Sequence, residues 1–166
     1  MSSATQLRIT EARWPHDRAL VETLFREYVD SLDADISFQD VASELAGLPG
    51  KYARPEGVVL IAWLGDEAAG CVALRPLEPG TCEMKRLYVR PAFRGHAIGR
   101  SLAEALIEHA RAMRYRIMVL DTLASMGAAL TLYRALGFKR IRPYYDNPLP
   151  GATYLGLELG APDDAS

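Results

Sequence analysis

One segment of the chain, EMKRLYVRPAFRGHAIG from Glu83 to Gly99, constrains the fold most. In its first half Leu87 and Val89 alternate with Tyr88, which is the period of a strand, and Pro91 ends that strand because proline has no N–H for a β-ladder. The small residues that follow would let the backbone approach a ligand closely, and the helix that they open presents unpaired N–H groups and the positive end of its dipole. They are Gly95, Ala97 and Gly99. The segment therefore predicts a strand, a sharp turn and a helix whose N-terminus binds a phosphate or diphosphate.

Two arginines, Arg94 and Arg100, bracket this loop and could add charge-assisted hydrogen bonds to the same anion. Taken alone, the loop also fits a plainer interpretation, in which its glycines shape a strand-to-helix turn and its arginines point into solvent. Other common phosphate motifs are absent, because the sequence contains no G-x-x-x-x-G-K-[ST] and no G-x-G-x-x-G followed by an acidic residue at the dinucleotide spacing. We therefore do not expect an ATP or NAD site.

The loop Arg94-Gly95-His96-Ala97-Ile98-Gly99 resembles the Q/R-x-x-G-x-G/A signature of the GCN5-related N-acetyltransferase (GNAT) superfamily, which binds the diphosphate of acetyl coenzyme A. A second segment, ALTLYRALGF ending at Phe138, is similar to that superfamily's second coenzyme segment, a helix that carries a tyrosine and leads through Gly-Phe into a strand. The resemblance is close over residues 57–138. Ala97 departs from the usual glycine, so we expect a backbone outside the left-handed region at this residue and looser coenzyme binding.

The resemblance implies a fold of the α+β, or mixed α/β, class, with a central, mixed, mostly antiparallel and twisted sheet flanked by helices. It implies acetyl coenzyme A as the acyl donor, bound by direct contacts from Leu87 and Val89. The Leu87 amide would polarise the acetyl carbonyl, and Val89 would hydrogen-bond the pantetheine arm like an added half-strand. Backbone amides of the loop would hold the diphosphate, and these belong to Arg94, Gly95, His96, Ala97, Ile98, Gly99 and Arg100.

Hydrophobic periodicity and turn residues place the elements of such a fold along the chain. Strands are expected at 7–12, 58–63, 69–77, 83–89, 117–121, 138–142 and 153–159, and helices at 16–32, 38–47, 98–113 and 125–136. Gly65-Asp66 and Pro79-Gly80 supply hairpin turns, and Ser37 with Asp40 forms an imperfect capping box before the second helix. Hairpins followed by a helix crossover predict a mixed sheet.

The 166 residues are 49% hydrophobic, which is enough for one core, so we expect a single domain over 1–160 and a disordered tail at 161–166. The net charge of -2 disfavours a nucleic-acid surface. The longest apolar run, 58–64, is far shorter than the ~20 residues of a membrane span, and the N-terminus is polar. We therefore expect a cytoplasmic protein with neither membrane nor nucleic-acid partners, and homodimer formation is left open.

Metal and covalent chemistry are not expected. His16, His96 and His109 are scattered without metal-ligand spacing, and His96 fits an exposed loop histidine better than a phosphate ligand. Cys71 and Cys82 lack a recognisable histidine partner and are expected to be reduced core residues. Without an activated nucleophile, the expected reaction is direct acetyl transfer to a primary amine in a ternary complex.

Glu83 is the candidate general base. A lysine-like amine, with a pKa near ~10.4, must lose a proton before it attacks, and the ~3.4 units above pH 7 correspond to about 4.6 kcal/mol. Glu83 begins the fourth strand, where the histone-acetylating branch of the superfamily has its glutamate base, and alternation would place it on one face with Lys85, Leu87 and Val89. A solvated strand-end glutamate paired with Lys85 or Arg86 fits the sequence equally well.

Tyr133 is the candidate general acid. Within the A-x-x-L-Y-x-x-x-G-F pattern it matches the tyrosine that the superfamily uses to protonate the departing thiolate of coenzyme A. A thiol has a pKa of about 8.5 and a phenol of about 10, so the proton transfer is nearly balanced. The plainer interpretation is a core tyrosine beside Ala129 and Leu136 on an amphipathic helix. The surrounding motif favours catalysis.

The acceptor is the least constrained part of this reading. Asp30, Asp33, Asp35 and Asp40 surround the first interhelical loop, which borders the acceptor site in the superfamily, and could favour a cationic amine. A solvated, helix-capping surface is the plainer interpretation of most of them. The loop Tyr144–Asn147 could contact an acceptor or form a simple turn. We expect an N-acetyltransferase for a small-molecule, peptide or protein amine, with a non-catalytic acyl-coenzyme A sensor or a succinyl or propionyl transferase as alternatives.

Overall fold

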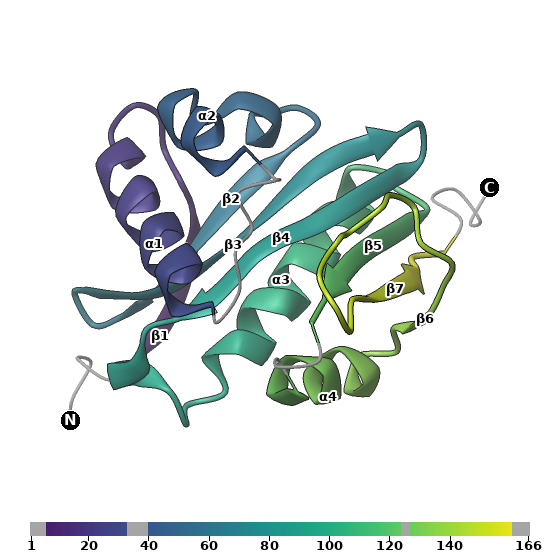
Figure 1. Cartoon of the computed structure of the whole chain (residues 1–166). Coiled ribbons are helices and arrows are strands. Elements are labelled where there is room, and N and C mark those ends of the chain that lie inside the picture. The colour runs from purple at the N-terminus through teal and green to yellow at the C-terminus, as the bar shows by residue number, and fades with distance from the viewer. Residues whose placement is uncertain (1–5, 33–39, 124–126, 161–166) are drawn as a thin grey trace.

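A computed structural model describes residues 6–32, 40–123 and 127–160 and arranges them around one seven-stranded sheet (Figure 1). The strands are β1 (Leu7–Glu11), β2 (Val58–Leu64), β3 (Glu67–Glu78), β4 (Thr81–Val89), β5 (Ile117–Thr122), β6 (Lys139–Arg140) and β7 (Thr153–Glu158). The helices are α1 (Arg18–Ser31), α2 (Val41–Ala46), α3 (Ile98–Ala112) and α4 (Gly127–Ala135), with the short 3-10 helices η3 (Gly50–Tyr52) and η4 (Pro91–Phe93). The expected fold class is confirmed, because the sheet is mixed and helices flank it.

The sheet has the order β1-β2-β3-β4-β5-β7-β6, and β4 with β5 is its parallel pair. All other neighbours are antiparallel, as the expected hairpins require. Gly65 and Gly80 have φ of 64° and 84° in the two hairpin turns, a backbone that glycine adopts without a steric penalty. α3 provides the crossover that makes β4 and β5 parallel. β6 is shorter than the expected strand 138–142, and the predicted cap at Ser37 lies outside the described residues.

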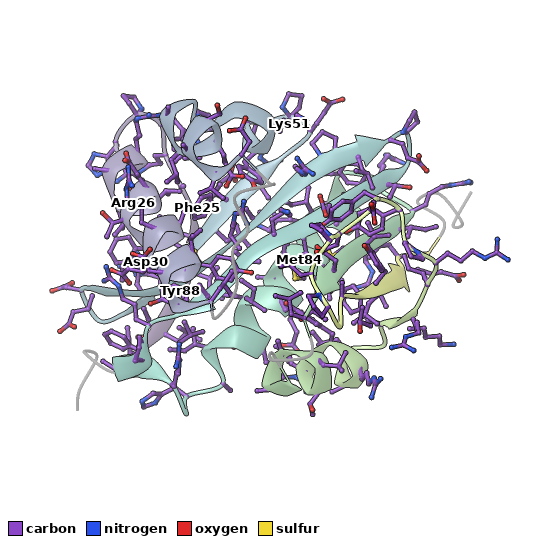
Figure 2. The ribbon with its side chains drawn as sticks, viewed as in Figure 1. Phe25, Arg26, Asp30, Lys51, Met84 and Tyr88 are labelled. Atoms are coloured by element: carbon purple, nitrogen blue, oxygen red, sulfur yellow. The ribbon has the colours of Figure 1, made fainter. Side chains whose placement is uncertain are left out.

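Two hydrophobic layers cover the two faces of the sheet. On the face that we call the α1/α2 face, α1 buries Val21, Leu24 and Phe25 against β2 and β3. On the opposite α3/α4 face, α3 and α4 pack on side chains of the same strands. Phe25 and Met84, both labelled in Figure 2, belong to the first and the second layer respectively.

A bulge in β4 changes which of its side chains share a face. The register with β3 shifts between the pairs Cys71↔Tyr88 and Ala73↔Lys85, and Arg86, inside this interval, has a φ of 61°. An extra residue in one strand reverses the alternation of side chains beyond it.

The expectation that Glu83 and Lys85 share a face with Leu87 and Val89 is therefore wrong. Leu87 and Val89 pack against the α3/α4 layer. Lys85 lies opposite Ala73 of the α1/α2 layer, and Glu83 lies two residues away on the same face. Periodicity could not reveal the change, because arginine has no preference for a left-handed backbone.

Candidate active site

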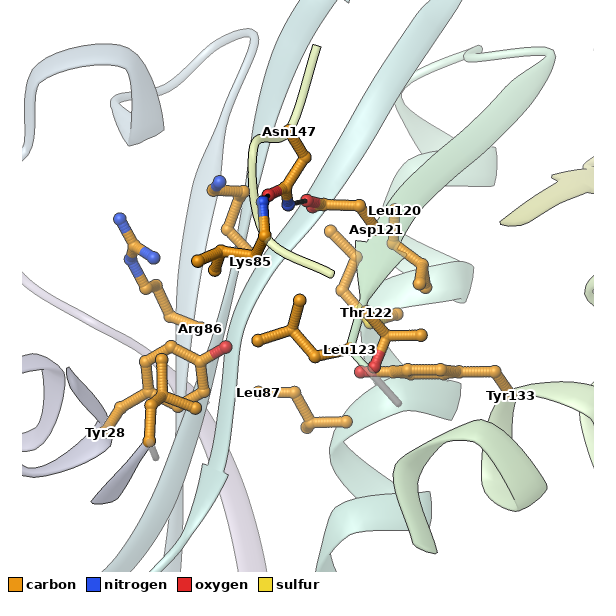
Figure 3. A pocket seen from close by; sticks show the side chains of 13 residues that line it. Tyr28, Lys85, Arg86, Leu87, Leu120, Asp121, Thr122, Leu123, Tyr133 and Asn147 are labelled. Carbon is orange, nitrogen blue, oxygen red and sulfur yellow. Dashed lines mark hydrogen bonds between the residues drawn. The ribbon is translucent and has the colours of Figure 1, made fainter. Parts of the chain in front are cut away.

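A cleft opens in the sheet where β4 and β5 diverge. Their ladder joins Thr81–Glu83 to Ile117–Val119. Beyond it, residues 84–87 of β4 and residues 120–123 along and after β5 line opposite walls (Figure 3). The cleft encloses about 40 Å³, which is space for a few waters. A strand edge that leaves its ladder in this way offers backbone N–H and C=O groups to an extended ligand.

Side chains from both faces of the sheet border the cleft. Tyr28 of α1 borders it on one side and Tyr133 of α4 on the other, with Leu87 between them (Figure 3). Burial raises the pKa of both phenols, because it disfavours the phenolate. Both hydroxyls therefore stay protonated at ordinary pH and can donate hydrogen bonds into the cleft.

The loop from Arg94 to Arg100 leads into α3 at the end of β4. It is largely exposed, whereas Ile98 is buried in the core and anchors the first turn of the helix. Gly95 has a φ of 93°, and a Cβ there would meet open space, so backbone conformation rather than packing requires glycine. The first N–H groups of a helix have no acceptor within it. The loop thus has the geometry of an anion site at a helix N-terminus.

The two arginines of this loop differ in their contacts. Arg94 donates from Nε to the carbonyl oxygen of Val89 at 3.1 Å, which ties the loop to the end of β4. Arg100 donates from Nε to Glu104 Oε2 at 3.0 Å, one turn further along α3. Arg94 is therefore held at the end of β4, whereas Arg100 is paired along α3.

Ala97 adopts the left-handed conformation, with φ 58° and ψ 25°. The expectation of a backbone outside this region is therefore wrong. The loop requires a left-handed residue directly before α3, and alanine takes it at a cost of roughly 1–2 kcal/mol relative to a right-handed backbone. Ala97 is exposed, so its methyl group lies at the surface.

Tyr133 fits both interpretations of its sequence position. Its residue is 7% exposed, and its ring packs against Phe138 with centroids 5.7 Å apart, as a core tyrosine would. Its hydroxyl nevertheless points into the cleft, toward Thr122 and Leu123 (Figure 3).

Glu83 is buried, with 1% of its surface exposed. Arg75 donates from Nε to Glu83 Oε1 at 2.7 Å, and the Tyr144 hydroxyl donates to Oε2 at 2.7 Å. The alternative of a solvated glutamate is therefore wrong, and the partners observed are Arg75 and Tyr144. Burial and the neighbouring Glu83 raise the pKa of Tyr144, so its hydroxyl remains a donor to the carboxylate.

The loop before β7 spans the cleft through two adjacent tyrosines. Tyr144 reaches Glu83 of β4, and Tyr145 donates its hydroxyl to Asp121 of β5. Asn147 also donates from Nδ2 to Asp121 Oδ2 at 2.8 Å. The sequence singled out this loop, whereas its carboxylate partners on two different strands depend on the fold.

A larger cavity, which we call the acceptor cavity, adjoins the cleft beside Glu83 and has a volume of about 440 Å³. The sequence did not single out Arg75, which lines it. Of the predicted acidic cluster, Asp30 is exposed on α1 and Asp40 borders an adjoining cavity, while residues 33 and 35 lie outside the described part. The charged lining consists of Arg75, Lys85 and Arg86 with Glu44, Glu83 and Asp146.

Neither a metal centre nor a membrane span occurs in the part of the chain that the structure describes. No three His, Cys, Asp or Glu side chains in this part gather closely enough to hold a metal ion. None of its helices is both long and apolar enough to cross a bilayer. Four of the charged groups that line the acceptor cavity form the ion pairs Arg75–Glu83 and Arg86–Glu44.

Known proteins share both the sequence and the architecture of this chain. A family model described as "Acetyltransferase (GNAT) family" matches residues 17–138. An uncharacterized N-acetyltransferase of Schizosaccharomyces pombe is 41% identical over 96% of this chain and 99% of its own length. An N-acetylaspartate synthetase of Danio rerio is 35% identical over 79% of this chain and 48% of its own length.

Solved structures agree at the level of the fold. An acetyltransferase of Streptococcus agalactiae has a TM-score of 0.73 and 24% identity, covering 92% of this chain and 98% of its own. A Salmonella typhimurium protein, solved with acetyl-CoA as its cofactor, has a TM-score of 0.68 and 22% identity, covering 95% of this chain and 98% of its own.

Proposed function

The chain belongs to the acetyltransferase (GNAT) family, as the Arg94–Gly99 motif predicts, and from this premise we propose that it transfers an acetyl group from acetyl coenzyme A to a primary amine by direct attack in a ternary complex. The observation that carries the proposal is the cleft between β4 and β5. It has Tyr133 on the α3/α4 face and the acceptor cavity with Glu83 on the α1/α2 face. Donor and acceptor can therefore approach one point of the sheet from opposite sides.

The donor side fits a coenzyme A thioester. The edge of β4 that has left its ladder with β5 can hydrogen-bond an extended pantetheine arm through Leu87 and Val89. The N–H groups that open α3 in an exposed loop, with Arg94 held at the end of β4, suit a diphosphate. When bound, the thioester supplies the activated acetyl group.

Two side chains handle the protons in this proposal. As the amine nitrogen forms its bond to the acetyl carbon, the carbon–sulfur bond breaks and Tyr133 gives its hydroxyl proton to the sulfur. The amine proton leaves toward Glu83. Because Arg75 and Tyr144 occupy one oxygen each of that carboxylate, the proton reaches it through a water or at an oxygen's second lone pair.

Release of free thiol from acetyl coenzyme A tests the function over a panel of amines. We expect release that depends on both the coenzyme and an amine. Coenzyme binding by calorimetry without release across the whole panel would instead identify a sensor of acyl coenzyme A. Faster release from succinyl or propionyl coenzyme A with the same amine would change the acyl group and keep the reaction class.

A further inference from the structure

Arg75 lines the acceptor cavity, and only part of its guanidinium group donates hydrogen bonds to the protein. Arg75 donates from Nε to Glu83, and its side chain is 28% exposed. No buried side-chain nitrogen or oxygen among the described residues lacks a hydrogen-bond partner, and no hydrogen bond joins the two Nη groups of Arg75 to a described residue. These Nη groups are therefore not buried, and because Arg75 lines the acceptor cavity and the adjoining one, they can donate to an anion bound there.

A second cation lies on the same wall. Lys85 borders both the acceptor cavity and the cleft. Burial lowers the pKa of Lys85, since removal of water disfavours the ammonium form, and the negative charge of Glu83 opposes this effect. A further anion in the cavity would stabilise the ammonium in the same way.

The third cation of the wall is already balanced within the protein. Arg86 donates from Nε and Nη2 to the two oxygens of Glu44 at 3.0 and 2.8 Å. Both residues of this bidentate pair line the cavity. Arg75, whose Nη groups make no hydrogen bond to a described residue, is consequently the cation available to a ligand beside Glu83.

Building on the proposed function, we propose that the acceptor is a free α-amino acid, whose carboxylate is bound by Arg75 and whose amino group lies at Glu83. The ion pair of Arg75 and Glu83 presents a cation and an anion side by side, with Nε and Oε1 2.7 Å apart. An α-amino acid carries its own cation and anion on one carbon, so both groups reach such a pair at once. A lysine side chain or a protein N-terminus has the amine without the adjacent carboxylate.

The size of the cavity agrees with this class of acceptor. At about 440 Å³ it lies at the small end of ligand pockets, which suits a free amino acid with its side chain. Its position beside the cleft brings the amino group to the point where the two faces of the sheet connect.

Matched acceptors that differ only in the carboxylate test this inference. Thiol release is measured for free amino acids, for their carboxamides and for the corresponding decarboxylated amines. We expect kcat/KM to be at least about tenfold higher for the amino acids, the size of one charge-assisted interaction. For the carboxamides, amine ionisation works against this result, because replacing the carboxylate by a neutral amide lowers the amine pKa and leaves more free base. Decarboxylation instead raises the amine pKa, so the carboxamide is the stricter of the two comparisons. Equal or higher kcat/KM for amides, polyamines or lysine peptides would overturn the inference while leaving the acetyltransferase function intact.

Direct binding decides the inference even without turnover. Calorimetry of the same acceptors is carried out on the full chain saturated with coenzyme A. Binding of an amino acid at least about tenfold tighter than its amide supports the inference, and equal binding, or none, overturns it. Absence of thiol release with every acceptor counts separately, against the proposed function.

Arg75 variants locate the effect. Because Arg75 touches Glu83, the readout is the ratio of kcat/KM for the acid to that for the amide, in which general damage cancels. Arg75→Gln should lower this ratio to near one, and Arg75→Lys should retain part of it. Arg54→Gln, at an exposed arginine paired with Glu11, is the matched control and should leave the ratio unchanged. An unchanged ratio in Arg75→Gln would overturn the assignment, and if that variant does not fold, the acceptor comparison on the unaltered protein still decides.

Discussion

Tyr133 presents its hydroxyl to the cleft while its ring stays in the core. Burial raises the pKa of this phenol, so it holds its proton at ordinary pH, but the same shift makes transfer to a thiolate less favourable than the near balance expected from ordinary pKa values. Tyr133→Phe should lower kcat by about 10² or more and leave coenzyme affinity nearly unchanged, because it removes the hydroxyl alone. The measurement is turnover at saturating substrates, with affinity from calorimetry.

The matched control is Tyr115→Phe. The Tyr115 hydroxyl donates to the carbonyl oxygen of Glu56, away from the cleft, so kcat should not change. A loss below about threefold in Tyr133→Phe, with chemistry limiting the rate, would show that the thiolate departs without this residue.

Both carboxylate oxygens of Glu83 accept a hydrogen bond, so an informative substitution must keep the shape of this side chain. Glu83→Gln keeps the shape but cannot take up the amine proton, so kcat/KM should fall at neutral pH and recover in part as rising pH supplies free amine. Glu78→Gln, at an exposed glutamate of the same hairpin, should follow the unaltered protein across the pH range. A Glu83→Gln profile identical to that of the unaltered protein would remove Glu83 from the proton path.

Ala97 occupies a left-handed position that glycine adopts without strain. Ala97→Gly should therefore leave the free energy of unfolding equal or raise it by up to about 1 kcal/mol, because relief of strain outweighs the extra entropy of glycine in the unfolded chain. Urea denaturation measures this change. Ala105→Gly, inside α3, is the contrasting control and should lower stability by about 1 kcal/mol. A clear loss in Ala97→Gly would mean that the methyl group makes a stabilising contact.

At the scale of elements, the ion pair of Arg86 and Glu44 joins the bulge of β4 to α2. Arg86 is 2% exposed at its side chain and is held by Glu44, which is 17% exposed. Arg86→Met would leave that carboxylate buried without its partner, so the free energy of unfolding should fall by about 3–5 kcal/mol. Arg54→Met breaks a pair with Glu11 that is largely exposed and should cost less than about 1 kcal/mol. Similar losses in the two variants, by urea denaturation, would contradict a structural role for the buried pair.

The order and type of the elements could be predicted because amphipathic periodicity and turn residues are local signals. The helix expected at 98–113 is α3, Ile98–Ala112, and the strand expected at 153–159 is β7, Thr153–Glu158. β6 is the exception, since it retains only Lys139–Arg140. Its ladder with β7 ends after two residue pairs. The length of this strand therefore depends on the tertiary structure and not on its own sequence.

The candidate site could be predicted only in part, because strand register determines the rest. Tyr133 and the loop before α3 follow from motifs. A plain two-residue turn at Pro79-Gly80 would place Pro76 opposite Glu83, whereas an irregularity in the hairpin moves Arg75 into that position. A shift of one residue changes the facing side chain from proline to arginine, so the ion pair at the centre of the acceptor cavity was not predictable from the sequence.

For the whole molecule, the central strands couple the two layers. Along β2, Val58 and Leu60 belong to the α3/α4 layer, while Val59 and Ile61 belong to the α1/α2 layer. These strands therefore supply packing surface to both layers. The cleft lies between β4 and β5, and the acceptor cavity shares Lys85 and Arg86 with it, so a shift of β4 would change both.

Three residue pairs join β4 to β5, so this junction is a short connection between two parts of the sheet, β1-β2-β3-β4 and β5-β7-β6. An extended ligand bound along β4 would stabilise this junction. In the free protein, amide hydrogen exchange should then be slower in β2 and β3 than in β5 and β7. The part of the sheet that is held by fewer ladder hydrogen bonds opens more often. Coenzyme A should slow exchange in β5 and β7 more than in β1. Uniform slowing across all strands would mean that the junction between β4 and β5 does not open separately. Coenzyme A would then bind the sheet without stabilising this junction in particular.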